Sequence, residues 1–449
     1  MTLPANYVEM KDSGIPWIGE IPTDWTLKRI KYLCNREPDS FVDGDWIESP
    51  HITDSGIRYL TTGNIGDGFF KRQGNGYITD KTFKELNCKY AYPGDLIISR
   101  LNAPYGRACI LPADEEKYVL AVDNVILRTD ENKSFLCYLM QCEGYQDCVQ
   151  DGAKGTTMRR ISRTNLGNVM LPIPPRSVQS AIVAYLDDQC AKIGEIIAEA
   201  TASIEEYKAW KASIIYEAVT KGLDPDAEMK DSGIEWIGQI PSDWSVIRLK
   251  YFISGYKAGP FGSALITDRL NSNGNILVYT PEHIAKKTAE LDKNLYLPDE
   301  RREEMQQFIV EPGDIIFPIV GSLGRSMLIT EDMPTGIINQ RLAKFKLYTE
   351  QLTIEYFLWL FAKSSFYSTF IELNCRGSII VNLTKQIVCD MPIPLPKNIQ
   401  EQQAICAFLE KKCSMIDALI EEKEVLISDL ETYKKSFIFE TVTGKRKVM

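Results

Sequence analysis

The stretch MKDSGIPWIGEIPTDW, Met10–Trp25, decides the architecture of this chain, because it returns almost unchanged as MKDSGIEWIGQIPSDW, Met229–Trp244. Thirteen of the sixteen positions are identical, at an offset of 219 residues. Three further pairs of segments follow in the same order: AYPGDLII (Ala91–Ile98) and VEPGDIIF (Val310–Phe317), LPIP (Leu171–Pro174) and MPIP (Met391–Pro394), and the segments that begin at Gln179 and Gln402. A colinear series of this kind indicates a tandem duplication.

Each copy begins with a long segment of mixed character. Short β-branched and aromatic runs alternate with Gly, Pro and Asn, which is the pattern of short strands joined by turns. YPGD and EPGD place Pro-Gly at the two central positions of a type II turn, directly before an apolar strand. Residues 135–149 and 354–371 have the spacing of helices. We therefore expect an α+β domain in each copy.

Each copy ends in a segment with apolar residues at three- and four-residue spacing, which is typical of a coiled-coil helix. In the first copy, where only Lys211 interrupts the pattern, these positions are Val183, Leu186, Cys190, Ile193, Ile197, Ala200, Ile204, Tyr207, Ile214 and Ala218. In the second copy, with Lys423 and Lys434 as interruptions, they are Cys406, Leu409, Cys413, Ile416, Ile420, Ile427, Leu430 and Phe437. The matched length and register predict that the two helices pack on each other, antiparallel. The alternative is two surface helices that pack on separate domains.

The duplication also predicts the limits of the parts. They are a first domain with the N-terminal repeat segment (1–175), a central long helix (176–222), a second domain (223–398) and a C-terminal long helix (399–449). The expected fold is α+β, with two pseudo-twofold-related mixed α/β domains joined by two long antiparallel coiled-coil helices. Because the segment after the first helix has its counterpart at the N-terminus, the end of the second helix near Gly444 should lie close to Met10.

Composition and motifs restrict the function. The eleven cysteines are scattered without a CxxC pair, and no apolar run is long enough to span a membrane, so we expect a cytoplasmic protein without disulfides. The chain has two histidines and no GxxxxGK[ST] phosphate loop, methyltransferase tetrapeptide or metal motif. The Asp of each PGD turn is expected to be structural. We predict that the chain is not an enzyme.

The repeated MKDSGIxWIGxIPxxW motif, GPFGS (Gly259–Ser263), the PGD strand and the LPxPxxxxQxxI helix entry together resemble specificity subunits of type I restriction–modification enzymes. The resemblance implies that both domains are target-recognition domains on double-stranded DNA. It also implies two methyltransferase (modification) partners that bind S-adenosylmethionine, and two restriction (translocase/nuclease) partners that use ATP and Mg. Adenine methylation and DNA cleavage would belong to that assembly, and this chain would bind no cofactor itself. GPFGS has no obvious equivalent in the first domain.

The two copies share their scaffold while their domain bodies differ, which predicts two different half-sites separated by unspecified base pairs. A helix of five heptads is about 54 Å long, sufficient to set recognition domains roughly one turn of duplex apart.

Candidate DNA contacts are polar or cationic residues in segments rich in Gly and turns, because such side chains reach base edges and phosphates. In the first domain they are Thr61, Thr62, Asn64, Arg100, Asn102, Tyr105, Arg107, Lys154, Thr156, Thr157, Arg159, Arg160 and Arg163. In the second domain they are Lys257, Ser263, Thr280, His283, Ser322, Arg325, Arg376 and Ser378. Asn124, Gln340 and Arg341 fit strand residues that satisfy their neighbours equally well.

The formal charge of −10 argues against a nucleic-acid partner, since phosphate binding requires cations. A scaffold without DNA, in which two adaptor domains on a coiled-coil spacer gather proteins, is therefore the alternative. The two hypotheses differ in one measurable property, because only the DNA-binding protein would show an affinity that falls steeply with salt.

Overall fold

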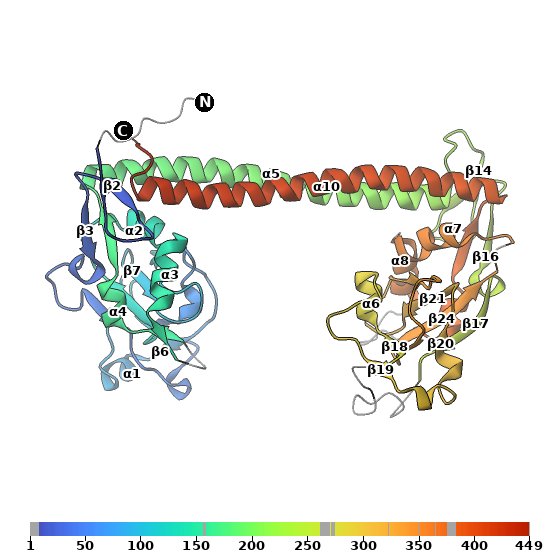
Figure 1. Ribbon diagram of the computed structural model, residues 1–449, viewed down its shortest axis with the longest axis horizontal. Coiled ribbons are helices and arrows are strands. Elements are labelled where there is room, and N and C mark those ends of the chain that lie inside the picture. Colours follow the sequence, from blue (N-terminus) through green and yellow to red (C-terminus); the bar gives the residue numbers. More distant parts are fainter. Residues whose placement is uncertain are drawn as a thin grey trace. The chain divides into compact units, whose positions relative to one another are not determined.

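The computed structural model describes residues 9–155, 159–260, 270, 274–321, 323–348, 350–363, 365–374 and 383–448. The chain divides into two compact units (Figure 1). The first unit comprises Met1–Thr201 and Glu424–Met449, and the second comprises Ala202–Lys423. Each unit therefore contains one mixed domain together with parts of both long helices.

The first unit is built on a four-stranded sheet in the order β4 (Phe41–Asp43), β10 (Asn124–Leu127), β7 (Leu96–Ser99) and β8 (Ala108–Ile110). A three-stranded sheet of β6 (Tyr77–Ile78), β5 (Ile57–Leu60) and β9 (Tyr118–Leu120) packs against it. The helices of the domain are α1 (Asp80–Glu85), α2 (Lys133–Met140), α3 (Glu143–Asp151) and α4 (Arg163–Asn168). Two-stranded ribbons are formed by β1 (Met10–Asp12) with β2 (Glu20–Pro22), β3 (Thr26–Arg29) with β13 (Met170–Ile173), and β11 (Ala153–Lys154) with β12 (Arg160–Ile161).

The second unit repeats the strand order of the first four-stranded sheet, and its other sheet gains a fourth strand, β20 (Ile309–Val310), where the first unit has only an isolated bridge between Ala91 and Tyr118. Its first sheet has the order β17 (Ile253–Ala258), β24 (Leu342–Leu347), β21 (Asp314–Pro318) and β22 (Met327–Leu328). Its other four-stranded sheet contains β19 (Tyr296–Leu297), β18 (Ile276–Tyr279), β23 (Gly336–Ile338) and β20 (Ile309–Val310). The ribbons are β14 (Met229–Asp231) with β15 (Gln239–Pro241), and β16 (Ser245–Arg248) with β25 (Pro392–Leu395). The helices are α6 (Pro281–Lys286), α7 (Ile354–Leu358), a π-helical turn (Trp359–Lys363), α8 (Ser365–Asn374) and α9 (Lys385–Cys389).

The PGD segments form the turns that the sequence predicts. Gly94 and Gly313 adopt φ values of 82° and 88°, the left-handed conformation that a type II turn requires at this position. The Asp95 carboxylate accepts a hydrogen bond from the backbone N–H of Tyr92 at 3.0 Å, and Asp314 accepts the equivalent bond from Glu311 at 2.9 Å. Each aspartate therefore closes its own turn.

The long helices are α5 (Arg176–Lys221) and α10 (Ile399–Val442), and they pack together antiparallel. In the first unit Tyr185 contacts Phe437, with ring centroids 5.5 Å apart. In the second unit Lys211, which interrupts the heptad pattern, lies 2.6 Å from both carboxylate oxygens of Asp417. The ion pair satisfies a cation at a position where the pattern calls for an apolar residue. The predicted α+β fold with paired long helices is confirmed.

Each long helix ends on a repeat segment. Gly444, which follows α10, packs against Pro22 and Trp25, and Gly222, which follows α5, packs against Pro241 and Trp244 in the same way. Both glycines have positive φ, 76° and 73°, so they terminate their helices with a left-handed residue. Lys445 donates a hydrogen bond to the carbonyl of Ile18. Since Pro22 pairs with Met10 in the β1–β2 ribbon, the predicted proximity of Gly444 to Met10 is confirmed.

The ribbons that lead into the long helices correct one alignment made from the sequence. Lys28 pairs with Leu171, and Ile247, its equivalent at offset 219, pairs with Ile393. Leu171 therefore corresponds to Ile393 rather than to Met391. The alignment is wrong by two residues. Because side chains on a strand alternate with period two, this error does not change which residues are assigned to the core face of the strand.

A buried glutamine near the start of each long helix ties the helix to its domain. The Gln179 side chain accepts a hydrogen bond from the Asn132 N–H at 2.8 Å and donates to Glu131 at 2.8 Å. Gln402 accepts from the Thr353 N–H at 2.9 Å and donates to the Gln351 carbonyl at 2.7 Å. These bonds explain the glutamine of the LPxPxxxxQxxI motif.

The Glu131 carboxyl is affected by that contact. Burial disfavours its charged form, but hydrogen bonds from Gln179 and Lys28 outweigh burial and hold the pKa of Glu131 below its ordinary value.

In the described ranges no helix is long and apolar enough to cross a membrane. In those ranges the cysteines other than Cys406 and Cys413 are free thiols.

Candidate nucleic-acid interface

Two of the predicted contact segments of the first domain are brought together by one buried arginine. Arg107 donates to the carbonyl oxygens of Ile65 (2.6 Å), Thr62 (2.9 Å) and Asn102 (2.8 Å). Its exposed fraction is 8%, and its donors join the turn after β5 to the loop after β7. The sequence assigned Arg107 to DNA, whereas in the structure its guanidinium holds the loops that surround it.

A second buried arginine connects the β11–β12 hairpin to the same place. Arg100 donates to the carbonyls of Ile161 at 3.1 Å and Val122 at 2.6 Å, and 6% of the residue is exposed. The Ile161 N–H donates in return to the Arg100 carbonyl at 3.2 Å. The predicted segments 61–64, 100–107 and 154–163 therefore form one surface, which we call the loop edge of the first domain.

The loop edge of the first domain carries both acidic and basic side chains. Asp43 lies 3.2 Å from Arg100 and 3.6 Å from Arg163, and Asp123 lies 3.3 Å from Arg160. Lys154 and Arg159 are exposed, and neither forms an ion pair with another residue in the described part of the chain. These two cations are available to a phosphate without breaking a protein contact.

The turn after β5 and the turn after β18 are built alike. Thr61 and Asn64 form a capping box in the first domain, and Thr280 and His283 form one in the second. Burial lowers the pKa of His283, which favours the neutral imidazole, and its Nδ1 accepts a hydrogen bond from the Thr280 N–H at 3.0 Å. Asn64 and His283 are buried, so both side chains support their turns.

The second domain has an equivalent loop edge. The Gly259 N–H donates to the Leu342 carbonyl, the Asn339 N–H to the Tyr279 carbonyl, and the Ile319 N–H to the Arg341 carbonyl. These bonds gather the ends of β17, β18 and β21 around the turn that precedes β24. Arg325 and Arg341 are exposed there. Lys257 of β17 donates to the Gln307 side chain.

The structure identifies the first-domain equivalent of Gly259, the first residue of GPFGS, which the sequence did not reveal. The Gly44 N–H donates to the Asn124 carbonyl at 2.8 Å, as the Gly259 N–H does to that of Leu342. A Cβ atom at Gly44 would overlap the Ala121 carbonyl, and one at Gly259 would overlap the Asn339 carbonyl. Only glycine permits this approach of two backbones, and the residues around it differ between VDGDW and KAGPF.

The remaining predicted contacts are distributed as follows. Thr61 and Thr62 lie on the turn after β5, and Asn102 and Tyr105 lie on the loop after β7, with Asn102 at φ 63°. Thr156, Thr157, Ser263, Ser322, Arg376 and Ser378 lie outside the described residues. Asp43 and Asp123, on the loop edge of the first domain, were not predicted, because acidic side chains are not expected beside phosphates.

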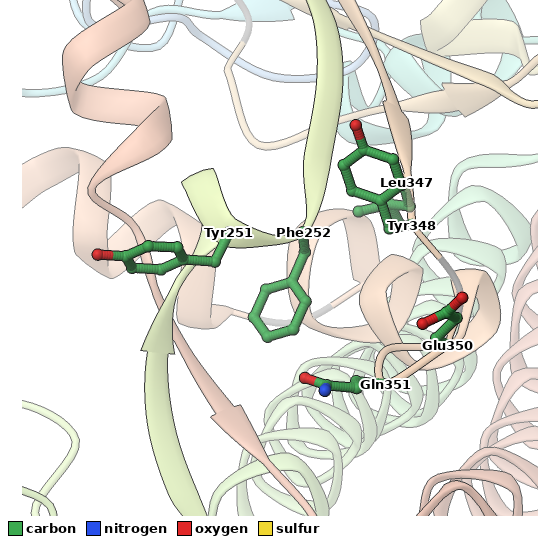
Figure 2. Close-up of a pocket in the computed structure, with 6 residues that line it drawn as sticks. All are labelled: Tyr251, Phe252, Leu347, Tyr348, Glu350 and Gln351. Atoms are coloured by element: carbon green, nitrogen blue, oxygen red, sulfur yellow. The ribbon is translucent and has the colours of Figure 1, made fainter.

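A pocket of about 500 Å³ lies at the end of the β17–β24 strand pair that is remote from Gly259 and the loop edge (Figure 2). Tyr251 and Phe252 line it from the segment before β17, and Tyr348, Glu350 and Gln351 line it from the segment after β24. Because the six-residue strands separate it from Gly259, the pocket lies about 20 Å from the loop edge. It belongs to the end of the domain at which Gln402 of α10 docks.

The two long helices expose apolar residues at equivalent positions. Ile196 of α5 corresponds to Leu419 of α10, and Trp210 corresponds to Tyr433, each at an offset of 223. Trp210 has an exposed fraction of 51% and Tyr433 one of 49%. The two exposed residues of each helix are two heptads apart, so they lie on one face of that helix.

No group of His, Cys, Asp and Glu in the described part of the molecule could hold a metal ion.

Comparison with known proteins relates both copies of the duplicated unit to one family. The family model for the type I restriction modification DNA specificity domain matches residues 22–206 and again residues 241–427. The type I restriction enzyme MjaVIII specificity subunit of Methanocaldococcus jannaschii is 23% identical over 95% of this chain and 94% of its own. The EcoBI specificity subunit of Escherichia coli is 21% identical over 79% and 74%.

Two solved structures have a similar fold. A chain from a structure of complex assembly and conformational transition in the type I R-M system gives a TM-score of 0.69 at 15% identity, covering 94% of this chain and 98% of its own. The HsdS subunit from Thermoanaerobacter tengcongensis gives 0.52 at 15% identity, with the same coverage.

Proposed function

Because the chain belongs to the type I restriction modification DNA specificity family and carries two of its domains, we propose that it reads an asymmetric, bipartite DNA target, one block with each domain. One observation supports the asymmetry. The two domains share the strand order of their first four-stranded sheet, the capping boxes and the glycine that approaches a carbonyl, yet the side chains on their loop edges differ. A protein that read one sequence twice would need the same side chains at both edges.

We assign different tasks to the residues of the loop edge. Lys154 and Arg159 contact phosphates, since they are exposed and bound to no other described side chain. Arg325 performs the same task in the second domain. Arg100 and Arg107 act as positioning residues, because their donors are engaged by carbonyls of the protein. This division removes four buried side chains, those of Asn64, Arg100, Arg107 and His283, from the set that touches DNA directly.

Selection of duplexes from a randomised pool tests the proposal. The full chain, assembled with its modification partner, should enrich one motif of two different blocks, and methylation mapping of a host genome with and without the gene should show that motif. Affinity for a selected duplex should fall linearly in log–log form with salt concentration. A protein that enriches no motif and binds duplex independently of salt would instead be the scaffold without DNA.

Specificity subunits are non-catalytic as a family. We propose that this chain recruits two methyltransferase subunits and two restriction subunits in the cytoplasm. S-adenosylmethionine, ATP and Mg would bind to those partners, which would methylate adenine and cleave DNA.

The apolar face of the long helices supports the partner proposal. Exposed aromatic residues at equivalent heptad positions are suited to packing against further helices, and the duplication would present the same contact twice. Trp210→Ser combined with Tyr433→Ser should reduce co-purification of the methyltransferase partner. Tyr32→Ser, on an exposed tyrosine outside the two long helices, is the matched control. Equal recovery of the partner with both variants would contradict the assignment.

A further inference from the structure

The turn that precedes β10 in the first domain and the turn that precedes β24 in the second occupy the same place in the fold. The Arg100 N–H donates to the Asp123 carbonyl at 2.8 Å, and the Ile319 N–H donates to the Arg341 carbonyl at 2.8 Å. The two glycine bonds described above fix the next residue of each turn in the same way. Asp123 and Arg341 are therefore equivalent positions, a match that the divergent sequences AVDN and NQRL conceal.

The two equivalent positions carry opposite charges. Asp123 has a carboxylate whose side chain is 19% exposed, between Arg160 at 3.3 Å and Arg100 at 4.0 Å. In the second domain the place of Arg100 is taken by Ile319, so no cation of that position accompanies Arg341. The difference is therefore a replacement of an acceptor by a donor, made on a backbone that is held in the same way in both domains.

The Arg341 side chain is exposed while its backbone is fixed. Its N–H donates to the Asn339 side chain at 3.0 Å, and its carbonyl accepts the bond from Ile319. The guanidinium forms no ion pair with a residue in the described ranges. A planar guanidinium on a rigid turn retains its donors for a bidentate acceptor outside the protein.

The Asp123 carboxylate is held in one orientation. Arg160 and Arg100 both lie within ion-pair distance of it, and both belong to the loop edge of the first domain. A carboxylate repels phosphate, so the direct hydrogen bond that an acid at a DNA-facing edge can form is one from a base donor. In the major groove those donors are the exocyclic amino groups of cytosine and adenine.

We infer that Asp123 and Arg341 are specificity-determining residues that read opposite hydrogen-bonding patterns, Asp123 an amino group of cytosine or adenine and Arg341 the O6 and N7 acceptors of guanine. The inference rests on the proposed function and adds the base chemistry recognised at one position of each block. Arg160 and Arg100 are positioning residues for the carboxylate. The same turn of a duplicated scaffold thus gives two different readings through one substitution of charge.

The test uses the full chain assembled with its modification partner and a set of duplexes in which every base pair of the wild-type motif is changed singly. In the wild-type complex one guanine in one block and one amino-bearing base in the other should be required. A good base contact discriminates by roughly 5- to 150-fold. Arg341→Ala should reduce the discrimination to about onefold at the guanine alone, and Asp123→Ala should do so at one position of the other block.

Two further variants keep the test decisive. Asp123→Asn retains the shape of the side chain and offers a donor as well as an acceptor, so it should also relax the requirement at that one position. Arg248→Ala removes an exposed arginine of β16, paired with Asp390 at 3.1 Å, and should leave every base preference unchanged.

The outcomes separate this inference from the proposed function. A wild-type complex that selects no motif would refute the function. A wild-type complex that selects a bipartite motif, with variants that keep all base preferences or weaken binding to every sequence equally, would refute only the roles of Asp123 and Arg341. Relaxation confined to one base pair in each block supports them.

Discussion

Arg107 offers a direct test of whether a residue in a predicted DNA-binding loop touches DNA or builds the loop. The change Arg107→Met keeps most of the aliphatic stem and removes the guanidinium, which takes a donor from the carbonyls of Thr62, Ile65 and Asn102. The Thr62 carbonyl keeps its bond from the Ile65 N–H at 3.2 Å. Hydrogen bonds to a charged group contribute about 1.5–3 kcal/mol each, but they are not additive. Each buried acceptor that is left without a donor costs about 1–3 kcal/mol, so with two or more affected we expect the free energy of unfolding to decrease by about 3–5 kcal/mol.

Calorimetry measures this effect. For a unit of roughly 150–250 residues, 1 kcal/mol corresponds to about 2–4 °C, so the transition of the first unit should fall by about 6–20 °C. Arg159→Met is the matched control, because Arg159 is exposed and its loss should change stability by less than about 0.5 kcal/mol. The control should instead bind DNA more weakly and reduce the slope of log affinity against log salt by about 0.9. The reasoning is refuted when Arg107→Met melts as the wild type does and lowers the salt slope, which is the behaviour of a direct phosphate contact.

Four other predictions follow from the fold. Gly222→Ala should cost about 1 kcal/mol for its positive φ, and Gly444→Ala should cost at least about 1 kcal/mol more because its Cβ would overlap a proline ring; equal melting temperatures would contradict this. Gln402→Leu should destabilise the second unit by about 2–5 kcal/mol in urea unfolding, whereas Gln403→Leu, on the exposed face of α10, should be neutral. The pKa of Glu131 is lowered in the folded state, so its contribution is present above about pH 4.3 and is lost as the pH falls; Glu131→Gln should flatten that part of the pH–stability profile, and an unchanged profile would argue against it. Deletion of one heptad from both long helices removes about 10 Å and should shorten the preferred spacer by about three base pairs or abolish assembly, whereas an intact spacer would exclude the helices as the element that sets it.

The sequence alone determined the duplication, the two long helices and the place where the chain closes on itself. Heptad spacing is a local signal, and the matching offsets of the repeats are visible along the chain without knowledge of any contact. The proximity of Gly444 to Met10 followed from the order of segments, because the counterpart of the N-terminal motif lies directly after the first long helix. The same reasoning failed by two residues at Leu171, where a repeated Leu-Pro pattern fits two registers.

Only the tertiary structure decided which polar residues of the loops face outward. Arg100, Arg107 and Arg159 stand in similar sequence contexts, yet the first two are buried and the third is exposed. The difference arises because burial depends on partners that are distant in the chain, such as Thr62, which lies 45 residues from Arg107. The equivalence of Gly44 with Gly259 was also inaccessible to the sequence. It depends on the close approach of two backbones, which requires a glycine and leaves the neighbouring residues free to differ.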